Sequence, residues 1–181
     1  MACVCPHRHR KTQNVKTNKN VSNSLTSGIK LRAVTESDLP IFYEQQLDAE
    51  ATRMADFSSR EQDVFMAHWK KIMGNQSNIL KTVVFNEQVA GNIVSWERDH
   101  EQEVGYWLGR EFWGKGIATA ALTELLALIK IRPLYARVSK HNVASRRVLE
   151  KCGFVVYKEV EEGFFLRLNK ELLLNEEITN G

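Results

Sequence analysis

The sequence predicts a single α/β domain, built on a mixed and mostly antiparallel central sheet that is flanked by helices. Runs of apolar residues with strand length are separated mostly by short turns, which is typical of antiparallel neighbours. One connection instead contains a long helical pattern, and the strands on either side of it should therefore be parallel. At 181 residues the chain is long enough for one domain with a sizeable core, and it contains no internal repeat.

The first elements are a strand and two helices. Residues 29–34 form an apolar run of strand length, and the helix after it carries Pro40 in its first turn, with Ser37 or Asp38 as its cap. A second helix is predicted over residues 60–72.

Three strands follow in an antiparallel meander. The apolar runs at residues 79–85 and 89–97 are joined by a short polar turn, which is typical of a hairpin. A third strand at residues 104–108 completes the meander.

A long apolar helix follows the third strand of the meander. Its apolar residues recur at three- and four-residue spacing from Ile117 to Ile129, and Pro133 bounds its far end. A strand at residues 134–138 is reached through this helix, so we expect it to lie parallel to residues 104–108.

A short helix and a hairpin end the domain. Asn142 caps the helix, and Gly153 supplies the left-handed residue that ends it. The closing hairpin pairs residues 154–160 with residues 164–168. We place the domain at residues 28–170, between tails at 1–27 and 171–181.

The composition is that of an ordinary globular protein, with 43% hydrophobic and 26% charged residues. No apolar run approaches the roughly 18 residues that cross a bilayer, and the N-terminus has no secretory signal pattern, so we expect a cytoplasmic protein without membrane contact. Residues 1–35 hold seven Lys or Arg and no acidic residue, which leaves 18 basic and 22 acidic residues in the remainder. A body with a net charge of −4 argues against nucleic-acid binding, except through the basic tail.

The N-terminal tail is polar and has no apolar period, so we expect residues 1–27 to be disordered. Cys3, Cys5, His7 and His9 alternate within it, but this spacing differs from the paired cysteines of common zinc sites, and we predict no metal. Cys152 is the only other cysteine, which makes a disulfide framework unexpected.

The most informative segment is a glycine-rich turn between the third meander strand and the long helix. Gly114 and Gly116 have no Cβ, so backbone N–H groups can crowd around an anionic ligand, and the N-terminus of the helix adds a partial positive charge. Lys115 adds a full charge. The segment therefore predicts a phosphate site, although a turn that only tightens the connection would share these glycines.

Two other nucleotide motifs fail at single residues. Gly109, Gly114 and Lys115 have P-loop spacing, but Gly116 stands where that motif needs a hydroxyl for Mg²⁺. A dinucleotide-binding fingerprint needs a third glycine at position 119, which is threonine here.

The order of elements and two motif blocks resemble the GNAT N-acetyltransferase superfamily over about residues 29–168. The first block is Gly-Tyr-Trp-Leu from Gly105, followed by Trp-Gly-Lys-Gly-Ile-Ala-Thr from Trp113. The second is Asn-Val-Ala-Ser from Asn142, followed by Lys-Cys-Gly-Phe from Lys151. Within the superfamily, the form of the second block with Ser145 is similar to the branch of ribosomal-protein N-terminal alanine acetyltransferases.

The resemblance implies an enzyme that takes acetyl-CoA as co-substrate and needs no metal. It implies that the strand ending at Leu108 splays from its parallel neighbour and pairs with the pantetheine arm. The cofactor-binding residues carried over are Trp107, Leu108, Trp113, Gly114, Lys115, Gly116, Ile117, Ala118 and Asn142. Two positions depart from the family pattern: Glu111 replaces the usual Gln or Arg, and Leu149 replaces the usual Tyr.

Glu103 is the predicted general base, because it matches the position of the catalytic carboxylate in several GNAT enzymes. An exposed glutamate at the start of a strand would look the same in the sequence. The alternatives are His100, Glu101 and the hairpin carboxylates Glu161 and Glu162.

Ser145 is the predicted acid for the leaving thiolate, because Leu149 removes the tyrosine that has this role in the family. A serine in the first turn of a helix can equally satisfy only backbone groups. A thiol pKa near roughly 8.5 makes the thiolate an undemanding leaving group, so the acid is not essential.

The acceptor is expected to be a primary amine on a peptide N-terminus or a small molecule. Deprotonating an α-amine with a pKa of about 7.7 to 8.0 at neutral pH requires only about 1 kcal/mol, whereas a lysine near 10.4 requires roughly 4.6 kcal/mol. This difference favours an α-amine. A non-catalytic acyl-CoA-binding module is the alternative function, and the sequence does not determine the oligomeric state.

Overall fold

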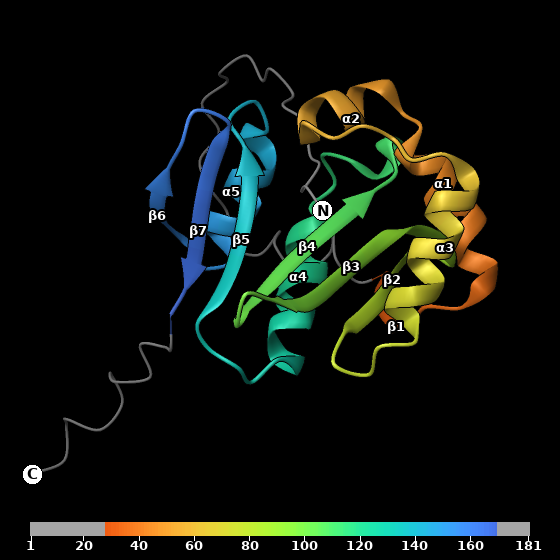
Figure 1. Ribbon diagram of the computed structural model, residues 1–181, viewed down its shortest axis with the longest axis horizontal. Helices are drawn as coiled ribbons and strands as arrows, with labels where there is room; N and C mark the ends of the chain where they lie inside the picture. The colour runs from red at the N-terminus through yellow and green to blue at the C-terminus, as the bar shows by residue number, and fades with distance from the viewer. Residues whose placement is uncertain (1–27, 170–181) are drawn as a thin grey trace, which may run out of the picture.

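The computed structural model describes residues 28–169, which form a seven-stranded sheet with the order β1-β2-β3-β4-β5-β7-β6 (Figure 1). The strands are β1 Ile29–Ala33, β2 Ile79–Phe85, β3 Gln88–Arg98, β4 Glu101–Leu108, β5 Leu134–Ser139, β6 Val155–Glu159 and β7 Gly163–Leu168. The helices are η1 Glu36–Asp38, α1 Leu39–Gln46, α2 Ala49–Ala55, α3 Gln62–Met73, η2 Arg110–Phe112, α4 Ile117–Leu128 and α5 Val143–Lys151. The predicted fold class is confirmed.

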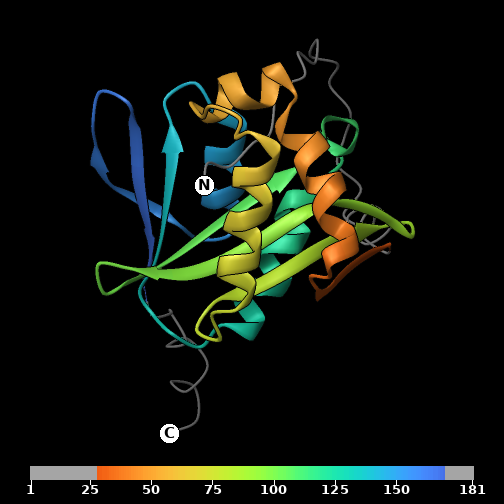
Figure 2. The ribbon, with the colours of Figure 1, turned by 45° about the vertical axis from the view of Figure 1, so that its right-hand side comes forward.

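All strand pairs are antiparallel except β4 and β5, which the α4 crossover makes parallel. The helices form layers on the two faces of the sheet, with α4 on one face and α1 and α3 on the other (Figure 2). Tyr106 and Leu108 of β4 belong to the same buried cluster as Leu122 and Leu125 of α4. This packing fixes α4 against β4, the strand that precedes its N-terminal loop. On the opposite face, Phe42 of α1 and Trp69 of α3 belong to a separate buried cluster.

Three elements differ from the sequence prediction. Helix α2 was not predicted because it is short, with only seven residues, and a polar stretch surrounds it; Asp48 caps it by accepting a hydrogen bond from the Ala51 N–H at 2.8 Å. Strand β4 begins at Glu101 rather than at residue 104, because its first residues are polar and hid the strand pattern. Phe154, predicted to start a strand, instead fills the core just before β6 with 2% of its surface exposed.

The first helix begins differently from the prediction of Ser37 or Asp38 as its cap: a short η1 turn precedes it, and Asp38 holds the N-cap position without a capping hydrogen bond. Thr35 precedes the first helical turn, and the Asp38 carboxylate turns back to accept a hydrogen bond from the Thr35 N–H at 2.9 Å. Asp38 therefore occupies the cap position of α1 without capping it, and Ser37 lies within η1.

Asp38 joins three separate elements. Its carboxylate accepts two 2.6 Å hydrogen bonds from Arg32 of β1 and a 2.8 Å bond from the Thr82 hydroxyl of β2. Burial by itself would raise the pKa of Asp38, but the hydrogen bonds from Arg32, Thr35 and Thr82 outweigh it and hold the pKa well below its usual range. The network ties the start of α1 to the edge of the sheet.

No helix among residues 28–169 has the length and apolarity to cross a membrane.

Asp38→Asn should lower the free energy of unfolding by about 2 kcal/mol at pH 7, because it removes the charge that Arg32 and the Thr35 N–H bind. The pKa of Asp38 is lowered in the folded protein, so its contribution is present above the ordinary carboxyl pKa of about 4 and is lost as the pH falls below it. Urea unfolding at pH 7 and pH 3 measures both effects. Glu36→Gln, at an exposed neighbour in the same turn, is the control and should change stability little.

Candidate active site

The parallel strands β4 and β5 pair over only two positions and then separate. Gln102 pairs with Leu134 and Glu103 pairs with Tyr135, after which both strands continue without pairing to each other. Figure 1 shows the resulting V, with β4 in green and β5 in cyan. Backbone groups along the inner edges of the V are therefore available to a ligand that enters as an additional strand.

The glycine loop lies at the open end of β4. The Trp113 Nε1 donates a hydrogen bond to the Leu108 carbonyl at 2.9 Å and fastens the loop to the strand. Gly114 and Gly116 have φ values of +70° and +79°, and a Cβ built on either residue would meet no atom within 4 Å. This open space in front of the first turn of α4 suits the close approach of an anion to backbone N–H groups.

A cavity of about 180 Å³ lies between this loop and α5. Its lining residues are Phe112, Gly114, Gly116, Ile117, Ala118, Thr119, Ala144, Arg147, Val148 and Lys151. The two cations, Arg147 and Lys151, come from successive turns of α5, which adds positive charge opposite the glycine loop. Lys115 does not line the cavity; its ammonium lies 5.8 Å from the centre of the Phe112 ring.

Arg147 and Lys151 are candidate phosphate ligands that were not predicted from the sequence. Their spacing of four residues after the Asn142 cap was the available signal, because it puts both on one side of α5. That α5 lies beside the glycine loop was visible only in the fold.

Several predicted cofactor residues have side chains that belong to the core. Leu108, Ile117 and Ala118 are at most 3% exposed, and the Trp107 Nε1 donates to the Gln45 carbonyl on the α1 side of the sheet at 3.0 Å. We infer that these four residues can contact a ligand mainly through their backbone.

Asn142 combines a satisfied acceptor with an unsatisfied donor. Its Oδ1 accepts a hydrogen bond from the Ser145 N–H at 3.0 Å, which is the predicted cap of α5. Its Nδ2 is fully buried and makes no hydrogen bond. A buried N–H without an acceptor is energetically unfavourable, so this group fits a ligand carbonyl such as an amide of the pantetheine arm.

The Ser145 hydroxyl is buried beneath the V, where it lies 2.8 Å from the Tyr106 hydroxyl of β4. The two oxygens form one hydrogen-bonded pair between α5 and β4. Ser145 therefore does more than satisfy backbone groups at the start of the helix, and Tyr106 brings a second hydroxyl, not predicted from the sequence, next to it.

Glu103 lies at the closed end of the V and is 3% exposed, so it is not an exposed residue at a strand start. Its Oε1 lies 2.7 Å from the Arg137 Nη2 of β5, and its Oε2 lies 3.9 Å from the Arg98 Nη1 of β3. The Arg137 contact is a close ion pair, although its N–H groups do not point straight at Oε1.

A family model described as an acetyltransferase (GNAT) domain matches residues 29–155. The chain belongs to the GNAT acetyltransferase family. This match covers both motif blocks and ends at the first residue of β6, and it confirms the resemblance seen in the sequence.

Known proteins of this family resemble the chain at low identity. "Putative ribosomal N-acetyltransferase YdaF" of Bacillus subtilis (strain 168) is 24% identical over 111 residues, which are 58% of this chain and 61% of YdaF. The chain thus spans less than two thirds of that relative. The crystal structure of aminoglycoside acetyltransferase AAC(6')-Ib in complex with coenzyme A has a TM-score of 0.68 at 18% identity, covering 78% of this chain and 95% of that one. RimL, a ribosomal L7/L12 alpha-N-protein acetyltransferase, has a TM-score of 0.66 at 19% identity, covering 81% and 92%.

The two departures from the GNAT pattern lie where the structure tolerates them. Glu111 is exposed in η2 and lies beside Gly109, outside the set of residues that line the loop cavity. Leu149 lies on α5 with its side chain fully buried in the core. As a leucine it offers no hydroxyl at the position of the family tyrosine.

The alternative bases occupy different places. His100 is fully exposed on the β3–β4 turn, and Glu101 is the first residue of β4. Glu161 lies in the turn between β6 and β7, and Glu162 lines a cavity of about 300 Å³ that Arg137 also lines. Glu162 therefore approaches the same side of the V as Glu103.

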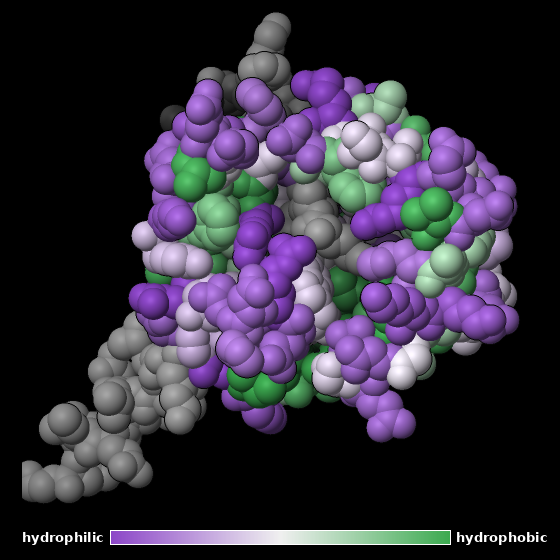
Figure 3. All heavy atoms as spheres, in the orientation of Figure 1, coloured by the Kyte–Doolittle hydropathy of each residue, from purple (hydrophilic) through white to green (hydrophobic). Residues whose placement is uncertain are grey.

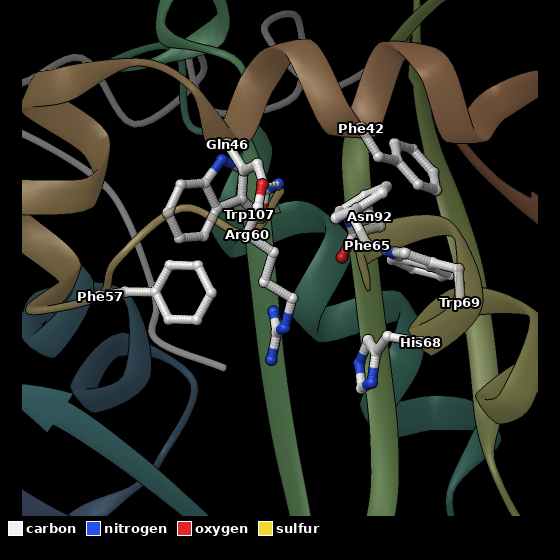
Figure 4. A pocket seen from close by; sticks show the side chains of 9 residues that line it. All are labelled: Phe42, Gln46, Phe57, Arg60, Phe65, His68, Trp69, Asn92 and Trp107. Carbon is white, nitrogen blue, oxygen red and sulfur yellow. Dashed lines mark hydrogen bonds between the residues drawn. The ribbon is translucent and has the colours of Figure 1, made fainter. Parts of the chain in front are cut away.

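The α1–α3 face of the GNAT sheet is hollowed beside the V. Figure 4 shows Arg60 and His68 near Trp107, Asn92 and Phe57, around a cavity of about 30 Å³, and Arg60 and His68 also line a neighbouring cavity of about 300 Å³. Burial lowers the pKa of His68, and the nearby charges of Arg60 and Lys71 lower it further. In Figure 3 hydrophilic side chains gather around the hollow between the two halves of the molecule.

No group of three or more His, Cys, Asp and Glu suited to a metal occurs between residues 28 and 169. The alternating Cys3, Cys5, His7 and His9 lie outside the described residues, as do both predicted tails.

Gly116→Val should weaken acetyl-CoA binding by roughly tenfold or more, because a β-branched residue is strained at φ +79° and its side chain fills the open space at the loop. Isothermal titration calorimetry in a chelating buffer measures it. Gly74→Val, in a turn where an added Cβ meets only ordinary contacts at 3.6 Å, is the control. Binding of ATP with Mg²⁺ as tight as that of acetyl-CoA would contradict the assignment of the loop.

Arg147→Gln with Lys151→Gln should weaken the binding of coenzyme A by roughly tenfold and make it less sensitive to salt, because both cations face the proposed phosphate site. The binding of a pantetheine derivative without phosphates should not change. Equal losses for the two ligands would show that the variant had disturbed α5 instead.

Proposed function

We propose that the protein transfers an acetyl group from acetyl-CoA to a primary amine, on a protein N-terminus or a small molecule. The observation that carries this proposal is the V between β4 and β5. It lies between two groups that can still bind a ligand. One is the open glycine loop at Gly114 and Gly116, and the other is the buried Nδ2 of Asn142.

The residues present fit acetyl-CoA. The backbone N–H groups of residues 114–118, together with Arg147 and Lys151, would hold its phosphates, while Asn142 Nδ2 and the free edge of β4 would hold its pantetheine arm. When bound, acetyl-CoA supplies an acetyl group on a thioester, and transfer to an amine leaves a thiol. A backbone N–H of β4 directed at the thioester oxygen would act as an oxyanion hole.

Glu103 is the proposed general base. Its Oε1 is paired with Arg137 at 2.7 Å, and the carboxylate would accept a proton from the amine, directly or through water. Glu162 is the second candidate, because it shares a cavity with Arg137.

The Ser145 and Tyr106 hydroxyls are the proposed proton source for the thiolate. Their 2.8 Å contact would let one hydroxyl donate its proton to the thiolate while the other hydroxyl replaces it, and a proton from water would then restore the second hydroxyl. Since a thiolate leaves readily, we expect this pair to assist the reaction without being essential.

An α-amine is the favoured acceptor. Removing its proton at neutral pH requires only about 1 kcal/mol, which a carboxylate in a fixed ion pair can supply. The names of YdaF and RimL, a ribosomal N-acetyltransferase and an alpha-N-protein acetyltransferase, support the same choice. A cytoplasmic location would suit such a substrate and stays a prediction.

The alternative is an acyl-CoA-binding module without catalysis. It would retain the loop and Asn142, and Glu103 would serve only to hold β4, β5 and β3 together. Mass spectrometry of a panel of peptides and small amines incubated with isotopically labelled acetyl-CoA distinguishes the two. An acetylated product supports the enzyme, and binding of acetyl-CoA without any product supports the module.

Glu103→Gln should reduce kcat by about 100-fold and leave acetyl-CoA affinity nearly unchanged, because a base acts in the transition state and does not hold the cofactor. Ser145→Ala and Tyr106→Phe should reduce kcat by less than about tenfold. Steady-state kinetics and calorimetry measure these effects. If Glu103→Gln is fully active from pH 6 to 9 while Glu162→Gln or Glu161→Gln is inactive, the base belongs to the closing hairpin.

A further inference from the structure

On one face of the β5–β7–β6 half of the sheet, helix α2 contacts only the end of β5, where the Ser139 hydroxyl donates a hydrogen bond to the Met54 carbonyl, and the remainder of the face has no helix over it among the described residues. It carries a cation–aromatic patch of six residues: Tyr135, Arg137, Tyr157, Lys158, Phe165 and Arg167. The other face of this half packs in the core with α4 and α5, through residues such as Ala136 and Leu166. The β1–β3 half differs, because α1 and α3 cover the same side of the sheet there (Figure 2).

A β-bulge builds the centre of the patch. The register between β6 and β7 shifts between Val156 and Lys158, so that Tyr157 and Lys158 both contact Phe165. The Lys158 ammonium lies 5.3 Å from the Phe165 ring centre and the Arg137 guanidinium lies 5.0 Å from it. The Phe165 ring therefore contacts two cationic side chains.

Two cations of the patch, Lys158 and Arg167, have no acidic partner among the described residues. No carboxylate of the described residues forms an ion pair with Lys158 or Arg167, and the buried Nε of Arg167 makes no hydrogen bond. Arg167 lies 5.5 Å from the Tyr157 ring centre, and a guanidinium stacked in this way keeps its edge N–H groups available for a carboxylate. Among the acidic groups nearby, Glu103 pairs with Arg137 and Arg98, and Glu159, next to Lys158, pairs with Lys140. Glu162 lines a cavity with Arg137 and Phe165 but forms no ion pair with Lys158 or Arg167. Burial raises the pKa of Tyr157, and the charge of Glu101 raises it further.

The patch is continuous with the closed end of the V. Arg137 contacts Phe165 in the patch and Glu103 in the proposed site, and Tyr135 pairs with Glu103 across β4 and β5. Neighbouring strands lie about 4.8 Å apart and an extended peptide advances about 3.3 Å per residue, so three residues of peptide cross from β5 to β6. A chain with its α-amine at Glu103 would thus lay its next residues on the patch.

We propose that the cation–aromatic patch binds an acidic segment that follows the N-terminal amine of a peptide acceptor. Carboxylates at about the third to fifth residues would meet Arg167 and Lys158, while the peptide backbone packs on Tyr157 and Phe165. This inference rests on the proposed N-acetyltransferase function and specifies its acceptor class.

The test compares two peptides with a free α-amine that differ only by Glu or Gln at residues three to five. The Glu peptide should have a KM about tenfold lower at low salt, and the double variant Lys158→Gln, Arg167→Gln should abolish that preference without changing kcat. The matched control Lys30→Gln, Lys70→Gln removes two exposed charges from β1 and α3, and it should retain the preference. Equal KM values for both peptides in the unmodified protein would overturn the proposal.

A second measurement separates this proposal from the catalytic one. Fluorescence anisotropy with N-terminally acetylated Glu and Gln peptides reports binding without any reaction. Tighter binding of the capped Glu peptide, lost in the Lys158, Arg167 double variant, supports the patch even if no amine is ever acetylated. An unstructured RNA oligonucleotide that binds the patch more tightly than the Glu peptide would assign the surface to nucleic acid instead.

Discussion

The early end of the pairing between β4 and β5 is the constraint on which the rest of the structure depends. A parallel pair needs a long crossover, and α4 supplies it, so the strand that opens the V also leads directly into the helix whose N-terminus faces the loop cavity. Because α4 is packed in the main core, the loop cannot move far from β4, and Trp113 fixes it further. The binding groups are therefore held in place before any ligand arrives.

A buried charge marks the point where the strands separate. Glu103 is 3% exposed, and its burial would be unfavourable without Arg137 and Arg98. These arginines come from β5 and β3, the strands on either side of β4, so the charge also connects the two halves of the sheet. The same carboxylate can therefore hold the V together and take part in chemistry.

The two sides of the V offer different kinds of recognition. Toward α4 and α5, the groups available to a ligand are backbone amides, the Asn142 side-chain amide and the cations Arg147 and Lys151, which suit a phosphorylated cofactor of fixed structure. On the opposite side, Arg60 and His68 line two hollows, and the cation–aromatic patch presents side chains on a sheet face. Side chains change readily in evolution without changing the sheet, which is why fold likeness to both aminoglycoside and protein acetyltransferases leaves the acceptor undefined.

The sequence alone determined the order of the strands and the long helix, the glycine loop, and the Asn142 cap, because each depends on local spacing or on a residue with special backbone freedom. It did not reveal α2 or the first residues of β4, whose polar residues carry no period. Only the tertiary structure decided that Glu103 is buried between two arginines, that Ser145 meets Tyr106, and that Arg147 faces Gly116 across a cavity. Each of these involves residues far apart in the chain, and their meeting depends on packing that no local pattern encodes.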